Sequence, residues 1–189
     1  MQSKATPAGR VMIRGARLSF PALFRPEAFN AGDEPKFKAT LLIPKGDPQA
    51  KDIERAILAV LKDKHPTKAE QILKSIRSNP NKFCVADGDT KSYDGYEGML
   101  AISAKSKNRP TVVDQLRNPL AEDDGKPYAG CYVNASLDFF SYDSSGIGVS
   151  ASLRGVQFVR DGESFGGGGS ANADEFDEVA TEDDTPDFL

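Results

Sequence analysis

The chain has 189 residues, with 24 Lys or Arg against 28 Asp or Glu and a net charge of −4. It contains no run of about eighteen apolar residues, which argues against a transmembrane helix, and its N-terminal segment lacks the apolar core of a secretory signal. Cys84 and Cys131 are far apart and each lies in an apolar-flanked segment, so free buried thiols are favoured over a disulfide, which fits a reducing cytoplasm. About 160 residues precede an acidic C-terminal segment, and this is enough for one domain with its own core.

Two strands are predicted in the first third of the chain. Residues 10–20 combine β-branched and apolar side chains with Arg, and Gly15 is a candidate β-bulge. A proline-containing loop is expected over 21–34. Residues 35–43 then alternate between apolar side chains and Lys or Thr, which is the pattern of a strand with one face in the core and the other outward.

The period then changes to that of a helix. Asp47 followed by proline is typical of a helix N-terminus, and apolar residues recur at helical spacing through residue 63. Thr67 and Glu70 form a potential capping box for a second, shorter helix that ends before Asn79. The two helices are predicted as one insertion, over about 47–78, that supports the β-structure.

The rest of the chain up to residue 160 is predicted as strands joined by polar loops. These strands are expected over 83–85, 99–105, 110–114, 128–142 and 148–160, with a second bulge at Gly155. Mostly antiparallel strands with one helical insertion favour a small Greek-key barrel over a parallel βαβ sheet. The predicted fold class is mainly β with inserted helices, a small Greek-key barrel formed by residues 1–160.

The loop 86–98 has two interpretations. Asp87, Asp89 and Asp94 have a spacing that is reminiscent of a calcium-binding loop, but Lys91 stands at the fifth position, where a ligand is required. Turns closed by Asp side chains onto backbone N–H groups are therefore favoured. No metal site and no cofactor are predicted anywhere in the chain.

One face of the strand within 128–142 carries three aromatic residues among polar ones, opposite the face expected in the core. Lysines and arginines have similar outward positions on the neighbouring strands. Rings stack on bases at about 1–3 kcal/mol each without reading sequence, while cations follow the phosphates. This pattern predicts a groove for single-stranded nucleic acid, with candidate contacts at Lys36, Lys38, Tyr93, Tyr96, Lys105, Lys107, Arg109, Tyr132, Phe140, Tyr142 and Arg154.

The C-terminal segment differs sharply in charge from the domain. Residues 161–170 are predicted as a Gly-rich linker and residues 171–189 as an acidic, disordered tail. Residues 161–189 hold ten acids and no base, so the body has 24 basic against 18 acidic residues, a net charge of +6. A basic domain suggests an anionic partner, and the tail would compete with it. The alternative is a tail that only improves solubility.

The end of the tail combines acids with two apolar side chains. This composition predicts a peptide that binds a basic, partly apolar pocket on another protein, through Asp183, Asp184, Asp187, Phe188 and Leu189.

Several strings of residues resemble a family of phage single-stranded-DNA-binding proteins. They are RLSFPALF at 17–24, KFKATLLIP at 36–44, KSKNRPTVVD at 105–114, GKPYAGCYVNASLDFFSYD at 125–143 and GIGVSASLRGVQFVRDGESFGGG at 146–168. The resemblance implies an OB-fold, a five-stranded Greek-key barrel with added helices that binds single-stranded DNA without strong sequence preference. It also implies a tail that recruits replication enzymes and competes with DNA. Here the tail departs from the usual pattern, because Leu189 follows the aromatic Phe188.

Together these observations predict a non-enzymatic protein of phage DNA replication or recombination, acting in the cytoplasm of a bacterial host. Its expected partners are single-stranded DNA and, through the tail, replication or recombination proteins, with self-association possible and oligomeric state open. Two alternatives remain, a protein-interaction adaptor that acts through its tail and a single-strand annealing protein. A nuclease is disfavoured because the acids of the body show no clustering.

Overall fold

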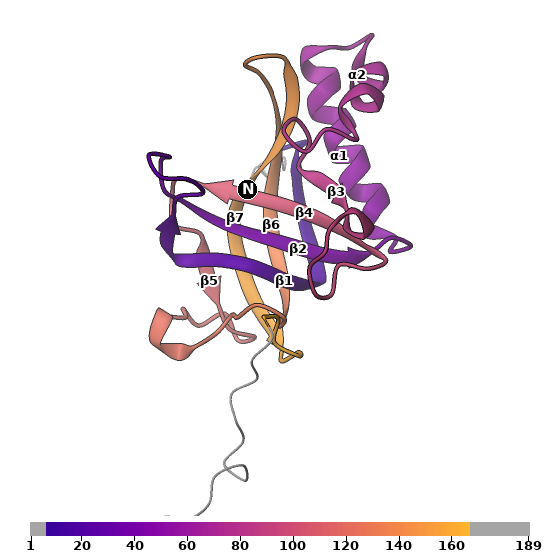
Figure 1. Ribbon diagram of the computed structural model, residues 1–189. Helices are drawn as coiled ribbons and strands as arrows, with labels where there is room; N and C mark the ends of the chain where they lie inside the picture. The colour runs from indigo at the N-terminus through magenta and orange to yellow at the C-terminus, as the bar shows by residue number, and fades with distance from the viewer. Residues whose placement is uncertain (1–6, 167–189) are drawn as a thin grey trace, which may run out of the picture.

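A computed structural model describes residues 7–166 of the chain (Figure 1). Short 3-10 turns at Gly88–Thr90 and Glu122–Asp124 accompany the main elements. The strands and helices are β1 (Arg10–Glu27), β2 (Lys36–Pro44), α1 (Gln49–Lys64), α2 (Ala69–Ile76), β3 (Val85–Asp87), β4 (Met99–Ser106), β5 (Thr111–Val113), β6 (Tyr132–Asp143) and β7 (Ile147–Arg160).

The strands form a closed barrel. Their order in the sheet is β3-β4-β2-β1-β6-β7-β5, and a parallel pairing of Lys105 with Ser152 joins β4 to β7. This pairing closes a ring of the five strands β4, β2, β1, β6 and β7, with β3 and β5 as short additions. The architecture confirms the predicted mainly β class and five-stranded OB-fold barrel with inserted helices.

Strand alternation and one helix face together fill the core. On β6 the predicted inward set is buried, from Val133 to Phe139 in steps of two. Helix α1 packs Ile53, Ile57 and Leu61 against the same core, and both helices lie together at one end of the barrel (Figure 1). No helix in the described part of the chain is long and apolar enough to cross a membrane.

Strand β1 is longer than predicted. It continues to Glu27, so the expected loop over 21–34 was wrong in its first part. The predicted bulge at Gly15 is confirmed, because the register with β6 shifts between Ile13 and Ala16 and Gly15 has a φ of +64°. A further shift in the register with β2, between Ser19 and Ala22, lets the strand bend and continue through its proline.

Other boundaries also moved. The predicted capping box at Thr67 and Glu70 was wrong, since α2 begins after Lys68 without a side-chain cap. Asp47 does accept a hydrogen bond at 2.9 Å from the Gln49 backbone N–H at the start of α1. Strand β6 starts only at Tyr132, because the preceding residues form a turn. The predicted bulge at Gly155 is confirmed by a register shift between β6 and β7.

Candidate nucleic-acid interface

A groove of about 1010 Å³ crosses the outer face of the barrel over β2, β4 and β7, bounded by the end of β6. Among the described residues, none of those that line it is acidic, and five are lysines. We call this surface the lysine groove; its cations are Lys36, Lys38, Lys91, Lys105 and Lys107. Such a groove presents a continuous positive potential to an anionic chain.

Strand register explains the rows of cations. Lys36 and Lys38 are two residues apart on β2 and share its outward face, and Lys38 is directly opposite Lys105 on β4. Lys105 is in turn opposite Ser152 on β7. Ser150 and Ser152 of β7 line the groove, and their small side chains leave space between the lysines for a ligand.

Two of the lysines have acidic partners within the described chain. Lys38 Nζ lies 3.1 Å from Glu27 at the end of β1, and Lys107 Nζ lies 3.0 Å from Glu34 in the β1–β2 loop. No described acid forms an ion pair with Lys36 or Lys105. The lysines of the β2, β4 and β4–β5 segments therefore differ in how readily they can take a new anionic partner.

Three aromatic side chains form a cluster at one side of the groove. The ring of Phe20 meets that of Tyr93 edge to face at 5.0 Å, and Tyr93 meets Tyr96 at 5.2 Å. Phe20 is 49% exposed and Tyr93 54%, whereas Tyr96 is buried and its hydroxyl donates to Ser19 Oγ at 3.0 Å. This aromatic cluster, Phe20, Tyr93 and Tyr96, thus has two accessible rings on a buried base.

The backbone of Phe20 is unusual. Its φ is +45°, a region that bulky residues rarely adopt, and it lies inside the second irregularity of β1. Such a conformation costs on the order of 1–3 kcal/mol and persists only where surrounding structure holds it. The strained backbone holds a large apolar ring at the surface, beside Tyr93.

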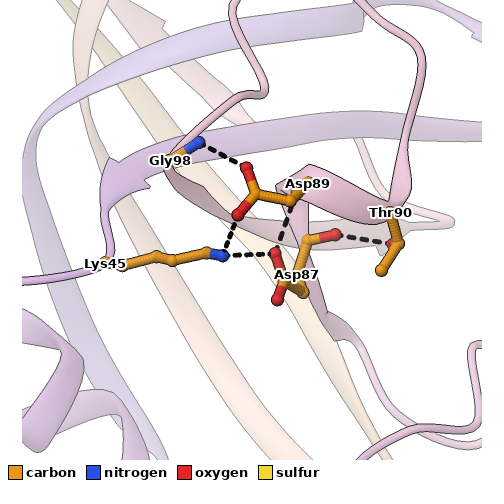
Figure 2. A network of polar contacts seen from close by, with 5 residues as sticks. All are labelled: Lys45, Asp87, Asp89, Thr90 and Gly98. Atoms are coloured by element: carbon orange, nitrogen blue, oxygen red, sulfur yellow. Dashed lines mark hydrogen bonds and ion pairs between the residues drawn. The ribbon is translucent and has the colours of Figure 1, made fainter.

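A polar network fixes the loop that carries Tyr93 and Tyr96 (Figure 2). Lys45 Nζ lies between Asp87, at 2.7 Å, and Asp89. Asp89 also accepts a hydrogen bond at 2.7 Å from the Gly98 backbone N–H, which ties the two ends of the loop together. We call Lys45, Asp87, Asp89 and Gly98 the Lys45 network.

The network confirms the turn interpretation of this loop. Asp87 Oδ1 accepts from the Asp89 backbone N–H at 2.9 Å, and an ammonium group, that of Lys45, lies between the two carboxylates. A hydrogen bond from Lys45 holds the pKa of Asp87 below its usual value. A hydrogen bond from the Gly98 backbone does the same for the pKa of Asp89. Both carboxylates therefore stay ionised at neutral pH, and the network is lost only as the pH falls through those lowered pKa values.

Most of the predicted contact residues line the lysine groove. Tyr96 does so only as part of its floor, since it is buried. The lining set comprises Lys36, Lys38, Tyr93, Tyr96, Lys105, Lys107, Phe140 and Tyr142.

Three predicted residues lie elsewhere. Arg109 stacks over the ring of Phe24, with 5.6 Å from its guanidinium carbon to the ring centroid. The guanidinium carbon of Arg160 lies 3.5 Å from the centre of the Tyr132 ring and covers it. Arg154 Nε lies 3.3 Å from Asp138. Tyr132 and Phe140 share the predicted face of β6 but lie near its opposite ends. Neither Tyr132 nor Arg109 lines the lysine groove, so the proposed interface does not include them.

Two aromatic residues that line the groove, Phe20 and Phe29, were not predicted from the sequence. Phe29 is the most exposed large apolar side chain described, at 85%. Lys91, which the sequence places in the same loop as Tyr93 and Tyr96, also lines the groove. An apolar ring in a polar loop between two strands is a signal that could have identified Phe29. The predicted tail contacts Asp183, Asp184, Asp187, Phe188 and Leu189 lie outside the described residues.

The chain leaves the barrel close to the aromatic cluster. The Phe165 backbone N–H donates to the Ala129 carbonyl at 3.0 Å. The guanidinium carbon of Arg17 lies 4.2 Å from the centre of the Phe165 ring. The ring also covers Gly95, where an added Cβ would lie only 2.4 Å from it. The last described residues of the chain therefore lie beside the loop that carries Tyr93.

Comparison with known proteins identifies the family. Residues 9–188 match the profile of the family described as "Enterobacter phage Enc34, ssDNA-binding protein". The chain belongs to this family. It is also 47% identical over 173 residues to protein p50 of Acyrthosiphon pisum secondary endosymbiont phage 1, covering 90% of this chain and 94% of that protein.

Solved structures agree with the assignment. The single-stranded DNA-binding protein from bacteriophage Enc34, in complex with ssDNA, is 29% identical and superposes with a TM-score of 0.71, covering 87% of this chain and 97% of that one. Gp2.5, a single-stranded DNA-binding protein encoded by bacteriophage T7, shares the fold at 18% identity and a TM-score of 0.53, with coverage of 91% and 100%.

Proposed function

We propose that this protein binds single-stranded DNA in the lysine groove, without strong sequence preference. The observation that carries the proposal is a groove with five lysines and, among the described residues, no acid in its lining, next to the exposed rings of Phe20 and Tyr93. The Enc34 relative, solved in complex with ssDNA, supports the same ligand class. The protein would act by binding and protecting the strand rather than by catalysis.

The groove supplies two kinds of interaction. Lysine ammonium groups neutralise phosphates and release counterions, which makes affinity salt-dependent with a slope near −0.7 per contact for single strands. Exposed rings stack on bases, which is tolerant of sequence because every base has a π-face. Small serines and alanines form much of the remaining lining.

We further propose that the acidic tail competes with DNA for the lysine groove. Phe165, which precedes the tail in the sequence, packs against Gly95 in the loop of the aromatic cluster, and the tail has the same sign of charge as DNA. When DNA fills the groove, the released end, with Phe188 and Leu189, would bind a replication or recombination protein in the host cytoplasm.

Removing the tail tests this competition. A protein that ends at Gly169 is expected to bind a labelled oligothymidine several-fold more tightly than the full chain at low salt, with the difference shrinking as salt screens both ligands. Fluorescence anisotropy across a salt series measures it. Equal affinities at every salt concentration would exclude competition but leave DNA binding intact, whereas no binding by either protein would refute the proposed function itself.

The Lys45 network gives a separate prediction. Lys45→Met should weaken binding of the oligothymidine about 5-fold, because the loop with Tyr93 must then be ordered on binding, at a cost of about 1 kcal/mol. The salt slope should stay unchanged, since Lys45 is not part of the groove lining. A slope reduced by about 0.7 would instead mean that Lys45 contacts a phosphate directly.

A further inference from the structure

A second, smaller groove of about 560 Å³ lies between the start of β1 and helix α1. Its polar lining consists of three arginines, Gln49 and Asp52, and its apolar lining includes Val11 and the partly exposed Met12. We call this surface the arginine groove, after Arg10, Arg14 and Arg55. None of these three was among the predicted contacts.

The arginines differ in their partners. Arg55 Nη1 lies 2.9 Å from Asp52 on the same helix, and Arg10 is paired with Asp138 at 2.9 Å. Arg14 forms no ion pair with any residue that the structure describes. Each paired guanidinium still has further N–H donors to offer, because an arginine carries five. Guanidinium groups also suit phosphate recognition, since they can donate two parallel hydrogen bonds.

A continuous row of residues joins the two grooves around the barrel. The cross-strand partners run Lys38 to Lys105, Lys105 to Ser152, Ser152 to Asp138, and Asp138 to Arg10. Partners in register point to the same face of a sheet, here the outer face. Neighbouring strands are about 4.8 Å apart, so the distance from Ser152 to Arg10 is only about 10 Å along this row.

Asp138 is the one acid in the row, and its charge is compensated. Arg10 Nε lies 2.9 Å from its Oδ1, and Arg154 Nε lies 3.3 Å from its Oδ2. Two cations around one carboxylate leave the crossing with a net positive charge. A phosphate chain that passes here therefore meets no repulsive barrier.

We propose that single-stranded DNA continues from the lysine groove over Ser152 and Asp138 into the arginine groove. Arg14 and Arg55 then bind phosphates of nucleotides that lie beyond those held by the lysines. This inference rests on the proposed function and extends it to a longer DNA path. The observations favour DNA over the protein's own tail, because the arginine groove is continuous with the lysine groove along a row of outward side chains.

The test compares short and long oligothymidines, of about 5 and about 15 nucleotides, which span the usual range for one OB barrel. In the full-length protein, Arg14→Gln with Arg55→Gln should weaken binding of the long strand about 25-fold near 0.1 M salt, and lower its salt slope by about 1.4. Binding of the short strand should change less than about 2-fold, because it fits within the lysine groove. The matched control is Arg25→Gln with Arg77→Gln, two exposed, ion-paired arginines outside both grooves.

Three outcomes would overturn the inference. If the double variant leaves both lengths unchanged while a lysine-groove variant weakens both, DNA stops at the lysine groove and the proposed function stands. If both lengths weaken equally with an unchanged salt slope, the arginines hold the tail away from the lysine groove rather than DNA. If the wild-type protein binds neither strand, the proposed function fails together with the longer path.

Discussion

Replacing Lys36 and Lys105 with glutamine is expected to weaken binding of single-stranded DNA about 25-fold near 0.1 M salt. Each phosphate contact adds about 0.7 to the salt slope of single-strand binding, which corresponds to about 5-fold in affinity per cation at this concentration. Neither lysine forms an ion pair with a described residue, so both are available to phosphates. The double variant should also lower the salt slope by about 1.4.

The groove contains its own matched control. Lys38→Gln with Lys107→Gln removes the same charge from the same surface, but these lysines are paired with Glu27 and Glu34. DNA must displace these carboxylates before its phosphates can bind Lys38 and Lys107. Replacing the two lysines leaves Glu27 and Glu34 unpaired near the phosphates. Titrations of both double variants across a salt series separate the cases. If Lys36→Gln with Lys105→Gln leaves the slope unaltered, the lysine groove is not the phosphate path.

The strand faces could be predicted because a strand has a strict period of two. The inward set on β6 and the outward lysines of β2 follow directly from alternation along the sequence. The barrel class follows too, from mostly antiparallel strands with one helical insertion. These features depend on local pattern alone, which a single sequence contains.

The position of a residue along its strand could not be predicted in the same way. Tyr132 and Phe140 share a face of β6, yet only Phe140 reaches the lysine groove. Which end of a strand meets which neighbour is decided by register and by barrel closure, here the pairing of Lys105 with Ser152. These are long-range properties, and alternation does not contain them.

The aromatic cluster was predicted only in part for a different reason. Tyr93 and Tyr96 were identified because they lie in a polar loop, whereas Phe20 was assigned to the end of a strand. Its exposure arises from a φ of +45° within an irregularity of β1, and no local pattern indicates a strained backbone at a phenylalanine. Phe20 therefore emerges from the tertiary structure alone.

Removing the exposed rings of the aromatic cluster should weaken binding of single-stranded DNA without changing its salt dependence. Stacking contributes about 1–3 kcal/mol per base, so Phe20→Ala and Tyr93→Ala should each lower the affinity for oligothymidine about 5- to 150-fold. The salt slope should equal that of the wild type, because no cation is removed. Tyrosine fluorescence offers a direct signal, since the chain contains no Trp. A loss of affinity with a reduced slope would mean that the groove itself had been disturbed.

The backbone of Phe20 allows stacking to be separated from folding. Glycine tolerates a positive φ and alanine does not, so Phe20→Gly should be more stable to thermal or urea unfolding than Phe20→Ala by about 1 kcal/mol. Both variants lack the ring, so both should bind DNA equally weakly. If the two variants differ in stability but bind DNA with the same affinity, the loss of affinity is due to the missing ring. Affinity that recovers with stability in the glycine variant would show instead that Phe20 only shapes β1, and that the strained backbone serves no contact with DNA.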